Sequence, residues 1–558
     1  MNVIVSGFQT KPAGTGDDNG TLVVTGTGII AYDGDVAVFM SGDNQRTTIF
    51  GEVYSTAGRA ILSQGDNAKV FIAASGEVSG TTGVQTGKNG FVQNAGIIEG
   101  QVAFDSGTLI NTGSIFGFVE IFFGGSLRNY GELIGGLTVE TRGLQQDFPV
   151  YNSGHMQNFD SRAFTTTVEN DGLIDNYYTQ NVLSLTNTGT IRNFRVDGAA
   201  TIVNRGLITG DGIASGNLIF LSDANDSYDG RSGSIVGTIV AGGGTDTLLG
   251  GAQSDSFDGS DRGATGGGDK LWGYGGDDTL IGDTGDLLVG GTGDDTFIVE
   301  TSGVTVKEVA GGGIDTVQTG ISYQLGANVE NLVLTGIQKI NGVGNTLANE
   351  ITGNAAANVI DGGAGADTMS GGAGADTYIV DNSGDQIVEL AGQGRDLVKS
   401  SVAYTLSANV EDLQLTGAAA IRATGNGLAN LITGNGAANI LDGFLGNDTL
   451  RGNGGADTFV FDSKLGSGNI DHIVDFSPAA DRFRLENAIF KALSPGALPA
   501  AAFKDLATGS VDTSDRILYD RPTGKLYYDA DGSRIGAAVQ FAVLDNHAAL
   551  TAASFLVS

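Results

Sequence analysis

Short apolar stretches separated by glycine-rich turns predict an all-β protein. Up to about Ser234, a phrase of the form Asn-x-Gly-x-apolar recurs, each time just before a short apolar strand. Its asparagines follow one another at nearly constant intervals, at Asn94, Asn111, Asn129, Asn152, Asn170, Asn187 and Asn204. A constant rung length stacks equivalent residues, so we expect a parallel β-helix over residues 1–235. Aliphatic side chains would lie inside, and the asparagines would form a ladder at a corner.

Local backbone chemistry adds two expectations for this first region. Asparagine and glycine tolerate positive φ, so the recurring phrase is expected to place both residues in turns of that conformation. The one longer interval, between Asn129 and Asn152, predicts a loop that bulges from a single rung.

A nine-residue period follows over residues 236–461. Three segments, 290–298, 362–370 and 371–379, fit the pattern G-G-x-G-x-D-x-U-x, in which U is apolar. Looser copies carry aspartate at the same sixth position: Asp246, Asp255, Asp278, Asp286, Asp448 and Asp457. The first six residues suit a turn that needs glycine for positive φ. The last three suit a strand whose apolar side chain points inward.

A longer period overlies the short one, because residues 297–380 match residues 378–461 at a constant offset of 81. Each copy holds four nine-residue units in unbroken phase, at 344–379 and 425–460. Two units make one coil, so residues 18 apart are expected to stack. The predicted pairs are Asn349 with Asp367, Asn358 with Asp376, Asn430 with Asp448, and Asn439 with Asp457. Further units centre on Asp315 and Asp396.

Stacked aspartates next to turn carbonyls predict several Ca²⁺ sites, because calcium takes about 6–8 oxygen ligands. Without the ion, the carboxylates repel one another and the glycine-rich turns carry a large entropy cost. Asparagine at the sixth position removes a charge, so those sites should bind weakly or only stack. The candidate side-chain ligands are Asp246, Asp255, Asp278, Asp286, Asp295, Asn358, Asp367, Asp376, Asn439, Asp448 and Asp457. The candidate turn glycines are Gly291, Gly293, Gly363, Gly365, Gly372 and Gly374.

These phased units closely resemble the hemolysin-type calcium-binding repeats of the repeats-in-toxin (RTX) family. The resemblance implies a calcium-bound parallel β-roll that is disordered at low cytosolic calcium and folds outside the cell. Export through the type I secretion machinery follows from it. Extracellular calcium modules bind at roughly 10⁻⁴–10⁻³ M, which suits such a switch. A glycine-rich linker is the alternative, but linkers do not keep a nine-residue phase with aliphatic residues.

The last region, residues 462–558, loses both periods. Four of its segments resemble the C-terminal domain of serralysin-type metalloproteases: Asp471-His-Ile-Val-Asp-Phe, Asp515-Arg-Ile-Leu-Tyr, Tyr527-Tyr-Asp-Ala-Asp-Gly and Ala538-Val-Gln-Phe. The resemblance implies a small mixed β-domain with an uncleaved secretion signal. Asp529 and Asp531 would hold another calcium ion or form a metal-free hairpin turn. We expect strands over 516–519 and 525–528, and short helices over 487–493 and 547–553.

The composition of the chain limits the kinds of binding partner and the cellular location that we expect. The chain has 558 residues, 92 glycines, no cysteine and a formal charge of −34. This charge argues against nucleic acid and anionic membranes, and it repels itself unless cations offset it. No stretch approaches about 18 apolar residues, so no membrane span is expected. The first residues, MNVIVSGFQTKPAG, lack the basic and apolar regions of a secretory signal, so an extracellular protein would carry its signal elsewhere.

Most enzyme classes lack their motifs here. Neither H-E-x-x-H nor G-x-S-x-G occurs, and the three histidines are scattered. A polysaccharide lyase or uronate epimerase on the β-helix stays open as an alternative, with acid–base candidates at Arg192, Arg195, Arg205, Asp175 and Tyr177. Solvated edge charges explain these residues more simply. We therefore favour a non-enzymatic adhesin, matrix or surface-layer protein that binds cell-surface polysaccharide or self-associates, and we assign no catalytic residue.

Overall fold

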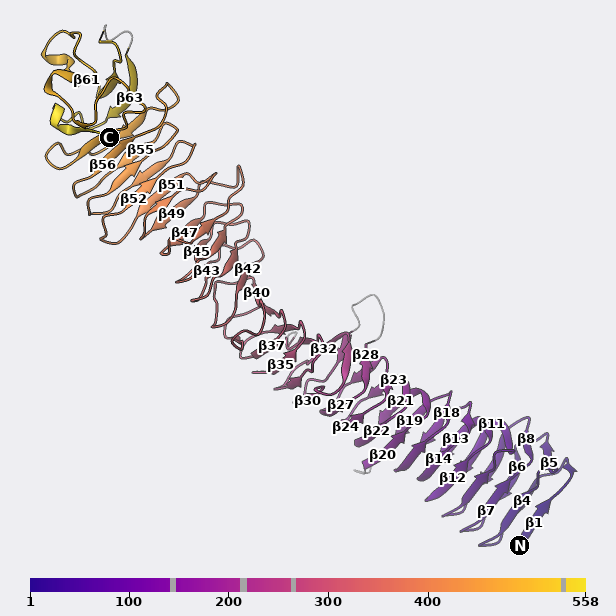
Figure 1. Ribbon diagram of the computed structural model, residues 1–558. Helices are drawn as coiled ribbons and strands as arrows, with labels where there is room; N and C mark the ends of the chain where they lie inside the picture. Colours follow the sequence, from indigo (N-terminus) through magenta and orange to yellow (C-terminus); the bar gives the residue numbers. More distant parts are fainter. Residues whose placement is uncertain (141–146, 211–217, 262–266, 533–537) are drawn as a thin grey trace. The chain divides into compact units, whose positions relative to one another are not determined.

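The computed structural model describes residues 1–140, 147–210, 218–261, 267–532 and 538–558, and nearly all its regular structure is short β-strand. The chain divides into two compact units, Met1–Gly313 and Ile314–Ser558. Each unit is a parallel β-solenoid over most of its length, and the second ends in a mixed sheet (Figure 1). The predicted all-β solenoid fold is therefore confirmed.

Seven strands of the first unit end on the predicted ladder asparagines. They are β12 (Gly90–Asn94), β14 (Gly107–Asn111), β17 (Gly125–Asn129), β20 (Asp147–Asn152), β22 (Thr165–Asn170), β24 (Val182–Asn187) and β27 (Ala200–Asn204). Consecutive members pair in parallel with their asparagines opposite one another. The predicted stacking of the rungs is thus confirmed, while the expected bulge before Asn152 falls on residues 141–146, outside the described residues.

The ladder asparagines are buried inside the solenoid and bond to one another. Nδ2 of Asn152 donates to Oδ1 of Asn170 at 2.7 Å, and the six bonds from Asn94 to Asn204 measure 2.7 or 2.8 Å. At the end of the ladder, Nδ2 of Asn204 donates to the hydroxyl of Tyr228 at 3.1 Å. Buried amides remain stable only when they are hydrogen-bonded, and here each rung satisfies its neighbour.

The glycine two residues after each ladder asparagine provides space rather than a special backbone conformation. Our expectation of positive φ is wrong for the ladder asparagines and for these glycines, all of which are described and none of which has positive φ. A Cβ atom on Gly172 would lie 2.1 Å from the carbonyl oxygen of Gly154 in the preceding rung. The rungs therefore pack too closely at this corner to admit any side chain.

In the second unit, strands follow one another at the predicted nine-residue interval. β44 (Glu350–Thr352) pairs in parallel with β46 (Thr368–Ser370), and β45 (Val359–Asp361) pairs with β47 (Thr377–Val380). Residues 18 apart are therefore neighbours in successive coils. The same pattern recurs in the second tandem copy, in β53 (Leu431–Thr433), β54 (Ile440–Asp442), β55 (Thr449–Arg451) and β56 (Thr458–Phe461).

The last coils continue into a mixed C-terminal sheet. β57 (Asp471–Ile473) pairs in parallel with β55 and with β63 (Val539–Leu544). β61 (Ile517–Asp520) and β62 (Lys525–Tyr528) are the two strands predicted there, and they pair antiparallel. Phe483 of β58 (Arg482–Leu485) stacks on Phe476 with ring centroids 4.5 Å apart, so aromatic packing closes the end of the core.

The two short helices expected in this region are wrong. Residues 487–493 form turns, because Phe490 is held between Tyr528 and Phe541 and Pro495 disfavours helix in the residues before it. In the second segment His547 has a φ of 51°, and only Ala552–Ser554 form a short 3-10 helix, η4.

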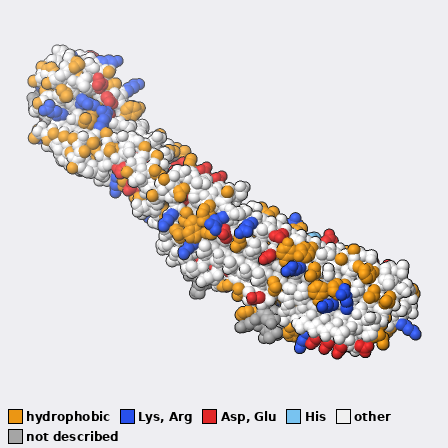
Figure 2. Space-filling view, turned by 60° about the horizontal axis from the view of Figure 1, so that its bottom comes forward, with side chains coloured by type: hydrophobic (Ala, Val, Ile, Leu, Met, Phe, Trp, Pro, Cys, Tyr) orange, Lys and Arg blue, Asp and Glu red, His pale blue; other side chains and the backbone are white. Residues whose placement is uncertain are grey.

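Exposed acidic side chains gather along one edge of the N-terminal coils (Figure 2). Among the exposed acidic residues of this region, Asp18, Asp43 and Asp66 stack on one another, because the backbone N–H of each later residue donates to the carboxylate of the one before it, at 2.8 and 2.9 Å. The described residues contain no helix that is long and apolar enough to cross a membrane.

Candidate calcium sites

The sixth-position aspartates form buried columns that run from coil to coil. In each column, Oδ1 of an aspartate accepts a hydrogen bond from the backbone N–H of the equivalent residue one coil earlier. The distance is 2.7 Å from Asn358 to Asp376 and 2.8 Å from Asn439 to Asp457. Two more columns of the second unit join Asn349 to Asp367 and Asn430 to Asp448. The predicted stacking of residues 18 apart is confirmed.

The first unit contains two columns of the same kind. One links Asp226, Asp246, Asp269 and Asp286 in turn, and the other links Asp255, Asp278 and Asp295. In Asp286 the second oxygen, Oδ2, also accepts a backbone N–H, from Asp283, so this carboxylate is held by the protein at both oxygens. In Asp255, Oδ2 accepts the N–H of Gly251.

In seven other column aspartates Oδ2 is buried and accepts no hydrogen bond. Among the described residues this is so for Asp246, Asp269, Asp278, Asp367, Asp376, Asp448 and Asp457. Burial is the largest cause that raises the pKa of these groups, to about 8 for Asp246 and Asp278 and to about 6 for Asp376 and Asp457. A buried carboxylate is costly unless it is protonated or paired, so the columns require protons or a cation.

The first two glycines of each unit have different roles around that oxygen. A Cβ atom on Gly371 would lie 2.3 Å from Oδ2 of Asp376, and one on Gly452 would lie 2.4 Å from Oδ2 of Asp457. The first glycine therefore provides room for the carboxylate. The second glycine provides the left-handed turn, as at Gly363 with a φ of 83°.

The remaining predicted glycines divide in the same way. Gly291, Gly293, Gly372 and Gly374 all have positive φ, between 86° and 138°. Gly365 does not, and a Cβ atom there would lie 1.9 Å from the carbonyl oxygen of Leu347 in the preceding coil. Turn conformation and close approach thus both exclude side chains next to the columns.

The chemistry of these positions fits Ca²⁺. Each of these seven aspartates offers a buried carboxylate oxygen without a hydrogen bond, close to the backbone of a turn. Calcium prefers such hard oxygen ligands. The chain has no cysteine, which leaves no thiolate for a softer metal. When bound, the ion would neutralise the negative charge of the stacked carboxylates.

Comparison with known families matches four segments to the RTX calcium-binding nonapeptide repeat, at residues 237–261, 264–286, 343–378 and 424–459. This chain carries RTX calcium-binding repeats. The regular RTX unit at 290–298 lies outside the matched ranges, although its Asp295 continues the column of Asp278 at 2.8 Å. No curated protein matches the chain.

Two RTX units in each tandem copy carry asparagine at the sixth position, and their amides bond within the protein. Nδ2 of Asn358 donates to the carbonyl of Ile340 at 2.6 Å, and its Oδ1 accepts the N–H of Asn354 at 3.0 Å. Asn439 repeats this arrangement with Ile421 and Asn435. Each amide is thus satisfied by the protein itself, and a role for Asn358 and Asn439 as calcium ligands stays a prediction.

Sequence reasoning missed several members of the RTX columns. Oδ1 of Asp471 accepts the N–H of Asp448 at 3.2 Å, and Oδ1 of Asp481 accepts the N–H of Asp457 at 2.9 Å. Both intervals are longer than 18, so a search for that period passes over them. The remaining signal is an aspartate directly before an apolar strand, as at Asp481 before β58. Three more members were missed because no regular nine-residue unit surrounds them: Asp226, Asp269 and Asp385.

The Asp-x-Asp-Gly turn near the C-terminus has features of both predicted forms, a calcium site and a metal-free turn. Asp529 is buried, and its Oδ1 accepts the N–H groups of Asp531 and Gly532 at 3.2 and 2.9 Å, which closes a hairpin turn. Its Oδ2 is buried without a hydrogen-bond partner among the described residues. The side chain of Asp531 is exposed. A calcium ion at this turn therefore stays a prediction.

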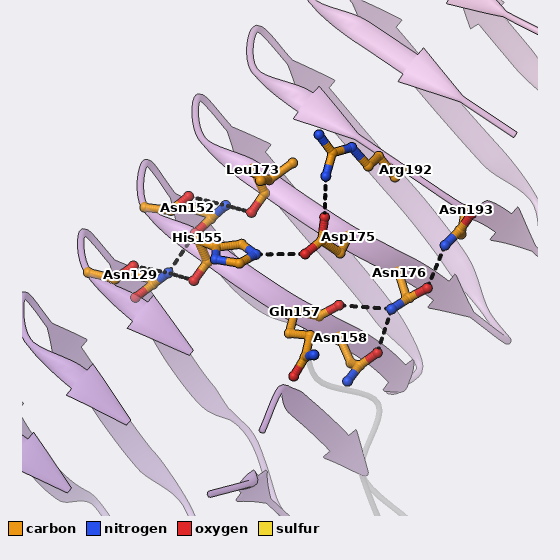
Figure 3. A network of polar contacts seen from close by, with 12 residues as sticks. Asn129, Asn152, His155, Gln157, Asn158, Leu173, Asp175, Asn176, Arg192 and Asn193 are labelled. Atoms are coloured by element: carbon orange, nitrogen blue, oxygen red, sulfur yellow. Dashed lines mark hydrogen bonds and ion pairs between the residues drawn. The ribbon is translucent and has the colours of Figure 1, made fainter. Parts of the chain in front are cut away.

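A polar network covers one face of the N-terminal solenoid (Figure 3). Asp175 is bonded by Nε2 of His155 at 2.7 Å and by Arg192 at 2.8 Å. Beside it, Asn158, Asn176 and Asn193 form an outer ladder with bonds of 2.7 and 2.6 Å. A hollow of about 490 Å³ follows this ladder, and its lining includes Phe118, Leu137, Asn158, Asn176, Tyr178, Asn193 and Arg195.

The acid–base cluster expected there is only partly assembled. Arg192 reaches Asp175, but Tyr177 is buried between Phe159 and Phe194, with ring centroids 4.8 and 4.9 Å away. Side chains alternate along a strand, so Tyr178 faces outward and Tyr177 faces the core. Arg195 pairs with Asp197 instead, and Arg205 lies at a separate hollow lined also by Asp229 and Arg231.

Proposed function

We propose that this chain is an extracellular protein that folds when it binds calcium after export through the type I secretion machinery. The buried Oδ2 atoms of the RTX columns carry this proposal. They lie in a low-dielectric interior and accept no hydrogen bond, which makes their negative charge costly. One divalent cation would compensate the charge of several of these oxygens at once. RTX proteins are typically secreted, which supports the location.

The difference in calcium concentration across the cell envelope would make the switch directional. Extracellular calcium modules bind at roughly 10⁻⁴–10⁻³ M, so the sites would be empty in the cytosol and filled outside. Without the ion, burial and neighbouring carboxylates raise the pKa of Asp246 and of Asp269, so ionisation of these groups opposes folding at neutral pH. The chain would then stay extended enough for export.

Calcium removal from the full chain tests the proposal. Circular dichroism and hydrogen exchange would compare the chelated protein with the same protein in millimolar Ca²⁺, and Mg²⁺ would serve as the matched control. We expect Ca²⁺ alone to increase strand content and to protect amides of residues 236–461. Identical spectra and exchange in both conditions would contradict calcium-dependent folding.

We further propose that the protein acts without catalysis at a cell surface, as an adhesin, matrix or surface-layer component that contacts polysaccharide. The outer asparagine ladder supports this role, because its amides recur along the solenoid beside Tyr178 and Arg195. Repeated polar groups with an aromatic neighbour suit a repeating sugar chain. Self-association through exposed sheet surface is the other form of assembly that a solenoid permits.

A uronate polysaccharide distinguishes binding from turnover. The calcium-loaded protein would be assayed for attachment to immobilised acidic polysaccharide, and in parallel for unsaturated product and epimer ratio. Attachment without turnover, weakened by Arg195→Ala, is the expected result. Turnover abolished by Arg192→Ala or Asp175→Asn would favour the lyase or epimerase alternative instead.

A further inference from the structure

Three buried carboxylates meet where the phased units end, at residue 379. Asp376, Glu389 and Asp396 each offer one carboxylate oxygen, and the three oxygens lie within 4.8 Å of one another. Their residues are only 1 to 6% exposed. Glu389 follows β48 (Gln386–Ile387), in a segment where the nine-residue phase is interrupted. Asp376 and Asp396 belong to one RTX column, and Glu389 adds a carboxylate from outside the nine-residue pattern.

The hydrogen bonds around the cluster fix its geometry but leave its charge in place. The backbone N–H of Asp376 donates to Oδ1 of Asp396 at 2.9 Å, and the N–H of Asp396 donates to Oε2 of Glu411 at 2.9 Å. The hydroxyl of Tyr378 accepts the N–H of Gly371 and donates to Oε1 of Glu389. Glu389 is thus held towards the column by a buried tyrosine.

Two oxygens of the cluster have no hydrogen bond to satisfy them. Within the part of the chain that the structure describes, Oδ2 of Asp376 and Oε2 of Glu389 are buried and lack a partner. Arg395, beside Asp396 in the sequence, forms its ion pair with Asp412 at 2.6 Å instead. Burial is the largest cause that raises the pKa of all three carboxyls, and nearby carboxylates add to it. Such a group of carboxylates requires a cation when it is ionised.

We propose that Glu389, which lies outside the nine-residue pattern, joins Asp376 and Asp396 in binding one Ca²⁺ ion as a three-carboxylate site. This inference rests on the proposed calcium-dependent folding and extends it. Calcium affinity rises with the number of charged ligands, so this site fills before the regular RTX sites. The ion fastens the segment after β48 to the column. The tandem repeat places Glu308 at the equivalent position of the first copy.

Calcium counting on the full chain tests the site. Native mass spectrometry and equilibrium dialysis would compare the wild-type protein with Glu389→Gln. Glu350→Gln is the control, because it removes the same charge from an exposed side chain of β44. We expect Glu389→Gln to lose the tightest site, with at least about a tenfold fall in its affinity and the other sites unchanged. Glu350→Gln should match the wild type.

The outcomes separate this site from the proposed function. A wild-type chain that binds no calcium contradicts the proposed function. A wild-type chain that binds calcium and a Glu389→Gln variant with the same count and affinities overturn only the three-carboxylate site. Should Glu389→Gln fail to fold, tyrosine-sensitised terbium luminescence replaces it, because the Tyr378 hydroxyl contacts Glu389. We expect Tyr378→Phe to lose emission at the first equivalent of Tb³⁺, and unchanged emission would overturn the site.

Discussion

The backbone N–H of Asn358 donates to Oδ1 of Asp376, 2.7 Å away and one coil further along the solenoid. This bond orients the carboxylate before any ion is present. It also gives the two carboxylate oxygens different roles. Oδ1 joins successive coils, and Oδ2 stays available for a metal ion. The dependence of the protein on pH, on single glycines and on the sixth-position asparagines follows from that division.

Metal-free protein should be more stable in mild acid than at slightly alkaline pH. Burial raises the pKa of Asp246 and Asp278 to about 8 and that of Asp269 and Asp448 to about 7. In the unfolded chain the pKa is about 3.9, so between about pH 4 and pH 8 the folded state binds more protons. Its stability is therefore lost as the pH rises through that range. Circular dichroism in calcium-free buffer should show more folded protein at pH 5 than at pH 8.

Calcium should remove this dependence, because the carboxylates are ionised both in the ion-bound columns and in the unfolded chain. In saturating calcium the stability of the folded protein is expected to change little between pH 6 and pH 8, which urea unfolding at each pH would measure. A metal-free protein that becomes more folded as the pH rises would show that the buried carboxylates do not control stability.

Two glycines of one unit should respond differently to alanine. Gly452→Ala places a Cβ atom 2.4 Å from Oδ2 of Asp457, so the carboxylate must move away from its position. Gly454→Ala meets no atom within 4 Å. We expect Gly452→Ala to raise the calcium concentration needed for folding at least severalfold, and Gly454→Ala to leave it unchanged. Equal effects in calcium titrations would mean that chain flexibility, rather than space for the carboxylate, explains the first glycine.

Asn430→Asp should create a new calcium requirement. Nδ2 of Asn430 donates to the carbonyls of Val410 and Glu411, both at 3.1 Å. A carboxylate there faces two carbonyl oxygens without a donor, which costs about 1–3 kcal/mol or more when it is buried. We expect lower stability in chelator and recovery in millimolar Ca²⁺, measured by urea unfolding. Loss of stability that calcium does not restore would show that the position cannot accept an ion.

The inner asparagine ladder should be most sensitive in its middle. Asn152→Ala leaves Oδ1 of Asn170 without its ladder donor, at about 1–3 kcal/mol. It also removes one acceptor of Nδ2 of Asn129, which keeps its bonds to the carbonyls of Gly131 and His155. Asn94→Ala, at the end of the ladder, affects one ladder partner, Asn111. Urea unfolding in calcium should therefore show the larger loss for Asn152→Ala. Equal losses would contradict a cooperative ladder.

Periodicity predicted the parts of the molecule that repeat. Constant spacing placed Asn94 to Asn204 in one ladder and Asn358 above Asp376, because a solenoid converts a fixed number of residues into a fixed position. Where the spacing changes, that conversion fails. Asp471 and Asp481 therefore escaped notice, although they occupy the next places in their columns.

The sequence repeat also does not show how much room a side chain has or how distant segments pack against one another. Gly172 looks like a turn residue in the sequence, but its role depends on the distance to Gly154 in another rung. Tyr177 and Tyr178 are adjacent in sequence, and only the pleat assigns one to the core and the other to the surface. Phe490 belongs to a segment with a helical pattern, yet its contacts with Tyr528 and Phe541 hold that segment as turns.

The hydrogen-bonded columns of the second unit have a polarity. The N–H groups of Asp448 and Asp457 donate to Asp471 and Asp481, which belong to the region that follows the repeats. The last repeat coils therefore depend on that region for their acceptors, and its removal would leave two buried N–H groups at the end of the solenoid without partners.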